Sequence, residues 1–162
     1  MSKITKQRLF EILSSRHLNN PYSKLASIPS PNNFKDMQIA AQRVKKAIAT
    51  KENITIVGDY DVDGVVSTTI MLEFFQSLNV KVNYIIPNRF EHGYGLSPKI
   101  ANKIDSGLVI TVDNGISAYE ASIILKDKNI DFIITDHHTV GEKVPYALAI
   151  INPKQEDCNF EF

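Results

Sequence analysis

The clearest pattern along this chain is the alternation, from residue 53 onward, of short apolar runs with segments of helical periodicity. The apolar runs predict five strands, at 54–58, 80–86, 107–112, 131–135 and 147–151. The segments between them predict helices at 64–78, 97–105 and 117–128. Strands that alternate with helices favour a parallel sheet with right-handed crossovers. We therefore expect a doubly wound α/β fold, with a mainly parallel five-stranded sheet and flanking helices.

The first fifty residues have a different pattern. Residues 3–17 predict an amphipathic helix, and a second helix is expected between Met37 and Ile48, after a break rich in Pro and Asn. Residues 1–51 carry ten Lys/Arg and two Asp/Glu, a net charge of +8, whereas residues 52–162 carry eight and sixteen, a net charge of −8. We expect a helical, basic N-terminal extension at 1–50 and an α/β domain at 51–162. A basic front end suits a phosphate backbone, and a merely solvated basic helix explains the charge equally well.

Polar side chains follow four of the predicted strands, at the point where each strand ends. They are Asp59, Asp61 and Asp63 after the first strand, Asn88 and Arg89 after the second, Asp113 and Asn114 after the third, and Asp136, His137 and His138 after the fourth. Parallel strands bring their carboxyl ends to one edge of the sheet, where open α/β sheets bind ligands. We therefore expect these residues to line one crevice.

The character of these residues indicates a metal site. Segment 59–63 places three carboxylates at alternate positions, and such like charges repel unless a cation or much water separates them. Neutral imidazole is a good ligand for transition-metal ions, and a neighbouring carboxylate such as Asp136 can fix its tautomer. Neighbouring side chains of an extended segment point to opposite sides, so we expect one of His137 and His138 to bind metal and the other to face the substrate.

Two other interpretations of the acidic cluster are weaker. Residues 59–64 match the first half of an EF-hand calcium loop, but Ile70 stands where that loop needs a bidentate Glu, and a predicted strand precedes it instead of a helix. A response-regulator receiver also places acidic residues at the strand ends of a doubly wound sheet. That architecture does not use adjacent histidines, and Lys154 does not stand where its lysine follows the last strand.

The loop 88–96 combines an arginine with two glycines. The planar guanidinium of Arg89 can hold a phosphate, and Gly93 and Gly95 permit close approach of the backbone. The start of the predicted helix 64–78 adds backbone amides that favour an anion at the same edge. An ordinary flexible loop explains 88–96 equally well.

The remaining composition bears on location. Cys158 is the single cysteine, which excludes an internal disulfide and fits a reducing compartment. No run approaches the roughly 20 apolar residues of a membrane span, and the first residues contain no apolar signal core. We therefore expect a cytoplasmic protein with no membrane partner.

Four separate segments together resemble the DHH phosphoesterase superfamily, which is named for the triplet present here at 136–138. Segments 58–64, 88–96, 112–115 and 152–154 resemble its RecJ branch, the single-strand-specific 5′→3′ exonucleases. The resemblance covers about residues 50–160. Other branches usually carry a histidine four residues before the equivalent of Asp61, where this chain has Val57, and this difference favours the RecJ branch.

The resemblance implies a two-metal hydrolytic centre. It implies that two Mn²⁺ or Mg²⁺ ions are held by Asp61, Asp63, Asp113 and His137. Two such ions can lower the pKa of a bridging water and neutralise the charge that develops on a phosphodiester. The catalytic residues beside them would be His138, near the scissile phosphate, and Asp136, with Asp59 behind the ligands. Substrate-binding residues would be Arg89, Asn114 and Gly115.

The resemblance also carries expectations about the whole protein. Its family has a further metal-binding aspartate and a second domain downstream, so we expect this chain to lack a C-terminal part and to be weakly active or inactive alone. The expected partners are single-stranded DNA and proteins of repair or replication. The alternatives are a phosphodiesterase or pyrophosphatase for small nucleotides, and a non-catalytic scaffold that retains the sheet.

Overall fold

The computed structural model describes residues 5–17 and 25–160, and the chain divides into two compact units, Met1–Ser30 and Pro31–Phe162. The first unit contains helix α1 (Lys6–His17) and the short 3-10 helix η1 (Leu25–Ser27). The predicted helix 3–17 is therefore found from Lys6 onward, and its first residues lie outside the described part of the chain. In the described residues, no helix is both long and apolar enough to cross a bilayer.

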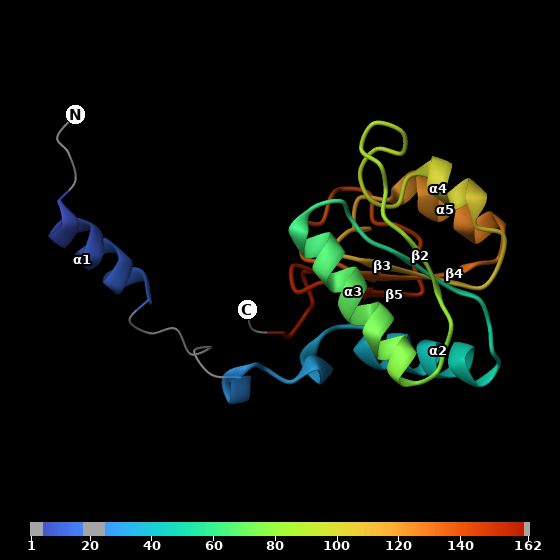
Figure 1. Cartoon of the computed structure of the whole chain (residues 1–162), viewed down its shortest axis with the longest axis horizontal. Helices are drawn as coiled ribbons and strands as arrows, with labels where there is room; N and C mark the ends of the chain where they lie inside the picture. The colour runs from blue at the N-terminus through green and yellow to red at the C-terminus, as the bar shows by residue number, and fades with distance from the viewer. Residues whose placement is uncertain (1–4, 18–24, 161–162) are drawn as a thin grey trace. The chain divides into compact units, whose positions relative to one another are not determined.

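The second unit is an α/β structure whose strands are all parallel (Figure 1). Its elements are η2 (Pro31–Asn33), α2 (Met37–Ala49), β1 (Ile54–Val57), α3 (Val62–Ser77), β2 (Asn83–Ile85), α4 (Pro98–Lys103), β3 (Leu108–Val112), α5 (Tyr119–Asp127), β4 (Asp131–Thr135) and β5 (Ala149–Ile151). The strand order is β2-β1-β3-β4-β5, so the order reverses between β1 and β3. In register, Ile110 of β3 pairs with Ile56 of β1 and Ile133 of β4. The predicted doubly wound five-stranded sheet is confirmed.

Helices cover both faces of this sheet, and each face has its own core cluster. In Figure 1 the sheet lies between α2 and α3 on one side and α4 and α5 on the other. Ala47 of α2 and Phe75 of α3, both fully buried, pack in the first cluster. Ile100 of α4 and Leu125 of α5 pack in the second. Burial on both faces explains why the central strands β1 and β3 are continuous apolar runs.

Helix α2 belongs to the same compact unit as the sheet. Ala40 and Ala47 pack in the first core cluster, and Arg43 bonds to Glu52 at 2.7 and 2.9 Å and to Asp131 at 2.6 Å. The compact unit therefore begins at Pro31, earlier than the boundary at residue 50 that the sequence suggested. The basic composition of 1–50 did not reveal this packing, because it reflects the exposed side chains of α2, whereas Ala40, Val44 and Ala47 form the face that packs on the core.

Helices α4 and α5 and strand β5 are shorter than predicted by one or two residues at one or both ends, and β2 and α3 differ for reasons that the structure shows. Strand β2 covers only Asn83–Ile85 of the predicted strand 80–86. The amide of Val80 instead donates to the carbonyl oxygen of Phe75 in α3 at 2.9 Å, and the side chains of Val80 and Val82 pack against the first core cluster. Helix α3 begins at Val62, two residues before the predicted start. Asp61 is its N-cap, and a side-chain oxygen of Asp61 accepts a hydrogen bond from the Gly64 amide at 2.9 Å.

Candidate metal centre

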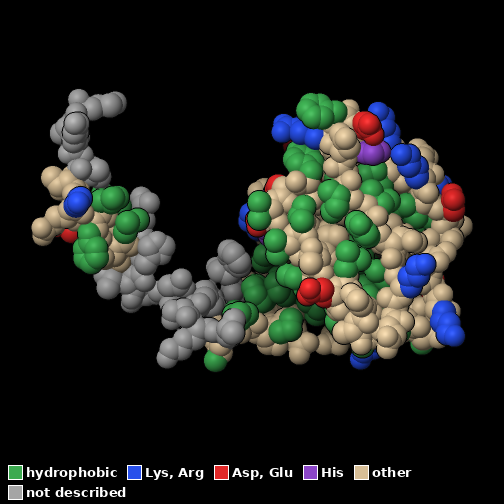
Figure 2. Space-filling view, viewed as in Figure 1, with side chains coloured by type: hydrophobic (Ala, Val, Ile, Leu, Met, Phe, Trp, Pro, Cys, Tyr) green, Lys and Arg blue, Asp and Glu red, His purple; other side chains and the backbone are tan. Residues whose placement is uncertain are grey.

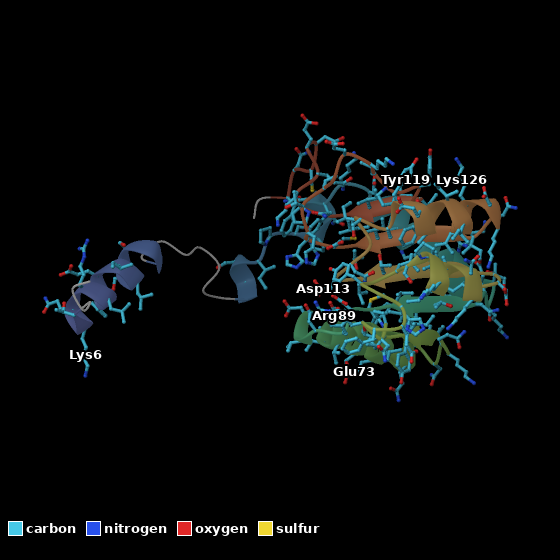
Figure 3. The ribbon with its side chains drawn as sticks, turned by 90° about the horizontal axis from the view of Figure 1, so that it is seen from above. Lys6, Glu73, Arg89, Asp113, Tyr119 and Lys126 are labelled. Atoms are coloured by element: carbon cyan, nitrogen blue, oxygen red, sulfur yellow. The ribbon has the colours of Figure 1, made fainter. Side chains whose placement is uncertain are left out.

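Three predicted site residues meet where β3 and β4 end. Asp113 follows β3, and His137 and His138 follow β4; each offers one ligand atom, and these atoms all lie within 4.8 Å of one another. Oδ1 of Asp113 lies 3.1 Å from Nε2 of His137. Figure 3 shows Asp113 and Arg89 at the same end of the α/β unit. The strand ends therefore converge as the parallel topology requires.

The backbone and surroundings of Asp113 are unusual. Its φ is 61°, in the left-handed region, and its amide donates to the carbonyl oxygen of Thr135 at 2.9 Å. Its side chain is 9% exposed. Burial, and next the charge of Asp61, raise the pKa of Asp113 above its usual range, although His137 opposes them. A carboxylate held among other carboxylates in this way is a group whose charge a bound cation would stabilise.

Asp136 holds the two histidines in place. Its side chain is 1% exposed, and Oδ1 accepts hydrogen bonds from the amides of His137 and His138 at 2.7 and 3.0 Å. Oδ1 also lies 2.7 Å from Nδ1 of His138, and Oδ2 accepts from the amide of Ile116 at 2.9 Å. An ionised carboxylate can only accept, so Nδ1 of His138 carries the proton and Nε2 is left as the ligand atom. These contacts position the two histidines, and a catalytic role for Asp136 stays a prediction.

The three aspartates of segment 59–63 lie in different settings. Asp63, exposed in the first turn of α3, lines an open hollow of ≈ 360 Å³ together with Asp113 and His137. Asp61 caps α3 through one oxygen, and its charge contributes to the raised pKa of Asp113. Asp59 is 1% exposed, and burial raises its pKa.

The predicted ligand set is therefore assembled only in part. The structure brings Asp113 and His137 together and adds His138, which the sequence placed beside the phosphate. Asp63 shares the hollow, and the charge of Asp61 acts on Asp113, but neither aspartate belongs to the group within 4.8 Å. Metal binding by Asp61 and Asp63 stays a prediction.

The structure gives Asn114 a different role from the predicted substrate contact. Asn114 is fully buried, and its amide nitrogen donates to the carbonyl oxygens of Val57 and Val112 at 3.0 and 2.9 Å. Its side-chain oxygen accepts from the amide of Leu96 at 3.1 Å. Both amide hydrogens are therefore used within the protein, and none is left for a phosphate. Asn114 ties the end of β1 and the loop before α4 to the end of β3.

Position 115 requires glycine for structural reasons. Its φ is 113°, and a Cβ added there would lie 2.3 Å from Oγ1 of Thr111 and 3.3 Å from a methyl group of Ile134. The position therefore needs glycine both for its backbone conformation and for space. A substrate contact by Gly115 stays a prediction.

The loop between β2 and α4 adds an aromatic residue that sequence reasoning missed. The hydroxyl of Tyr94 lies 3.4 Å from Nδ1 of His138 and 3.5 Å from the carbonyl oxygen of Asp113. Burial and the nearby carboxylates raise the pKa of Tyr94, so the hydroxyl keeps its proton and can donate. Arg89 is exposed in the same loop, with its guanidinium carbon 5.7 Å from the centre of the Tyr60 ring. The sequence feature that could have indicated Tyr94 as a site residue is its position between Gly93 and Gly95, in the loop that carries Arg89.

Comparison with known proteins places this site in a family. The family model described as "DHH family, N-terminal domain" matches residues 53–160. Among curated proteins, the RecJ single-stranded-DNA-specific exonuclease of Bacillus subtilis strain 168 is 42% identical over 144 residues, which is 87% of this chain and 18% of the relative. The corresponding protein of Haemophilus influenzae is 38% identical over 159 residues, which is 94% of this chain and 28% of the relative. The chain thus spans under a third of these relatives.

Solved structures give the same result. A crystal structure of exonuclease RecJ bound to manganese matches with a TM-score of 0.69 and 31% identity, over 76% of this chain and 32% of that one. RecJ from Thermus thermophilus in complex with Mn²⁺ matches with a TM-score of 0.62 and 30% identity, over 77% of this chain and 18% of that one. With a family model that covers most of the α/β unit, the chain belongs to the DHH family.

Proposed function

We propose that this chain carries the cation-binding part of a metal-dependent exonuclease that degrades single-stranded DNA from the 5′ end. The observation that carries the proposal is the convergence of ligand atoms from Asp113, His137 and His138 at the carboxyl edge of the sheet. The proposal is also supported by the similarity of this chain to RecJ exonucleases. Two solved structures of RecJ contain manganese.

The side chains fit a hard or borderline divalent cation. Carboxylate and imidazole are ligands that Mn²⁺ accepts, and Mg²⁺ prefers the carboxylates. Asp113, His137 and His138 would hold one ion, and Asp61 and Asp63 at the start of α3 would complete a pair of Mn²⁺ or Mg²⁺ ions. When bound, such ions supply a nucleophilic water near neutral pH and stabilise charge on the phosphate.

The residues around the ligands bind and orient the substrate. Asp136 fixes the ring of His138, and the Tyr94 hydroxyl donates to the carbonyl oxygen of Asp113 beside that ring. Arg89 is exposed at this edge and would bind a phosphate of the strand through its guanidinium group. The loop that carries this arginine is held by internal hydrogen bonds, so the bound phosphate would lie at a defined distance from the cations.

The first test measures cation binding by the chain itself. Mn²⁺ at 100 times its dissociation constant should stabilise the fold by about 2.7 kcal/mol, which thermal unfolding detects. Asp113→Ala should abolish this shift. Asp105→Ala is the matched control, because the Asp105 side chain is 94% exposed and precedes β3 at the opposite edge. Equal stabilisation of both variants would contradict the proposed site.

The second test measures hydrolysis by the whole protein. With Mn²⁺ and 5′-phosphorylated single strands, we expect release of 5′-mononucleotides and loss of turnover in Asp113→Ala. An unchanged substrate at high enzyme concentration would refute the exonuclease. Faster hydrolysis of dinucleotides or pyrophosphate than of long strands would instead favour the small-nucleotide phosphodiesterase. Recruitment by repair or replication proteins and a cytoplasmic location stay predictions.

A further inference from the structure

The loop between β2 and α4, residues 86–97, protrudes from the α/β unit (Figure 1), and hydrogen bonds within the loop hold its tip. Asn88 organises the tip: its carbonyl oxygen accepts from the amide of His92 at 2.8 Å, and its side-chain oxygen accepts from the amide of Phe90 at 2.9 Å. In return, the amide of Asn88 donates to Nδ1 of His92 at 3.1 Å. Lys99 of α4 donates to the carbonyl oxygen of Glu91 at 3.0 Å and anchors the loop from below.

This ordered tip presents a phenylalanine almost entirely to water. Phe90 is 96% exposed, compared with 60% for Tyr84 on β2 and 48% for Phe74 on α3. Figure 2 shows hydrophobic side chains at the outer end of the protruding loop, next to Lys or Arg. A single exposed apolar side chain is common on protein surfaces and means little alone. The exposure of Phe90 becomes informative because aromatic side chains and an arginine lie near it in and beside the same loop.

A series of ring contacts connects His138 of the metal centre to the loop that carries Phe90. The Tyr94 ring meets the His138 ring edge-on, with centroids 6.0 Å apart and planes at 88°. Tyr60 meets Tyr94 in the same way at 6.4 Å and 86°, and the guanidinium of Arg89 lies over Tyr60. Phe90 is the next residue in the chain. Aromatic faces beside a cationic group are what proteins use to bind single strands without reading their sequence, since every base has a flat face.

We propose that Phe90 is a base-stacking residue: one nucleobase of the single strand packs on its exposed ring, while Arg89 holds a neighbouring phosphate. The proposal rests on the proposed function, because it assigns a contact to the same substrate. It gives a reason for the hydrogen bonds at Asn88 and His92, since a backbone that is already ordered loses less entropy when a base packs on the ring that it carries. The contact is independent of base identity and needs only that a base be present.

The test compares strands with and without individual bases. Binding of 5′-phosphorylated oligothymidylate to the whole protein is measured by fluorescence anisotropy in EDTA, so that the strand stays intact. Three further strands each lack one base, at the first, second or third nucleotide from the 5′ end. Phe90→Leu keeps an apolar side chain but removes the flat face, and Phe90→Trp keeps the face. Tyr84→Leu is the matched control at an exposed aromatic residue on β2.

We expect Phe90→Leu to weaken binding of the complete strand by roughly 5- to 150-fold, the range for loss of one base–aromatic stack. The same substitution should have no effect on one of the three strands that lack a base, and Phe90→Trp and Tyr84→Leu should bind like the unsubstituted protein. Equal losses on all four strands, or no loss on any, would overturn the stacking role and leave the exonuclease standing. Failure of the unsubstituted protein to bind any single strand would overturn both.

Discussion

Substitution of Asn114 separates a structural role from a substrate contact. The Asn114 side chain is fully buried and makes three hydrogen bonds, to Val57, Val112 and Leu96. Asn114→Ala leaves three backbone groups without this partner. Since an unsatisfied buried polar group costs about 1–3 kcal/mol, we expect a loss of at least about 3 kcal/mol. That is a large part of the roughly 5–15 kcal/mol that stabilises a typical domain.

The assay is urea unfolding of this chain, followed by circular dichroism, with the free energy of unfolding obtained by linear extrapolation. Asn53→Ala is the matched control, because the Asn53 side chain makes one exposed 3.4 Å hydrogen bond to Ser106, and its loss should change the stability by less than about 0.5 kcal/mol. Asn114→Asp tests the donors, since its second oxygen would face the carbonyl oxygens of Val57 and Val112. It should also destabilise the fold clearly.

A cost below about 1 kcal/mol for Asn114→Ala would refute the reasoning, because the three bonds would then add little beyond one ordinary hydrogen bond. If, in addition, the whole protein carrying Asn114→Ala kept its stability and lost affinity for single strands, the predicted substrate contact would be right after all. The two roles therefore give opposite results in the two measurements.

Three further substitutions test the site and its support. Burial and the charge of Asp61 raise the pKa of Asp113, so ionised Asp113 destabilises the metal-free fold at pH 7, and this penalty disappears as the pH falls through the raised pKa. Asp113→Asn should therefore raise the melting temperature at pH 7, lose that advantage in acid, and no longer respond to Mn²⁺; a lower melting temperature at pH 7 would contradict this. Gly115→Ala, whose Cβ would clash with Thr111, should cost about 1–3 kcal/mol in urea unfolding; an unchanged midpoint would show that the backbone relaxes. Arg43→Leu removes a guanidinium that is 10% exposed and bonded to two carboxylates, and should cost about 1–3 kcal/mol, whereas the exposed Lys35→Leu should cost under about 1 kcal/mol; equal costs would refute the difference.

The fold was largely predictable because its strongest determinant is local. Strands β3 and β4 were predicted to within one residue, since β3 is buried along its whole length and the centre of β4, residues 132–134, is an apolar run buried on both faces. Strand β2 was overextended at its start, because Val80 and Val82 satisfy the same apolar pattern by packing against the core without strand pairing. Periodicity reports burial, and it does not report which backbone groups pair.

The location of the site could be predicted from the sequence, but the roles of its individual residues could be predicted less well. Parallel topology alone predicts that Asp113 and the two histidines share one edge of the sheet, and the structure brings their ligand atoms together there. Asn114 could not be distinguished from a ligand-binding amide, because its partners Val57 and Leu96 lie 57 and 18 residues away in the chain. The resemblance predicts Asp61 as a ligand, yet an aspartate three residues before Gly64 at a helix start is also a typical N-cap.

The three candidate ligand atoms come from the ends of two adjoining strands, β3 and β4, whose pairing runs from Leu108 with Asp131 to Val112 with Thr135. Asp113 and the histidine pair are separated by a complete helical crossover, so a peptide containing either strand alone lacks the other half of the group. The proposed cation site would therefore exist only once the seam between these strands has closed, and removal of a bound cation by a chelator should lower the stability of the folded state. A titration with Mn²⁺ would consequently count the molecules in which the seam has formed.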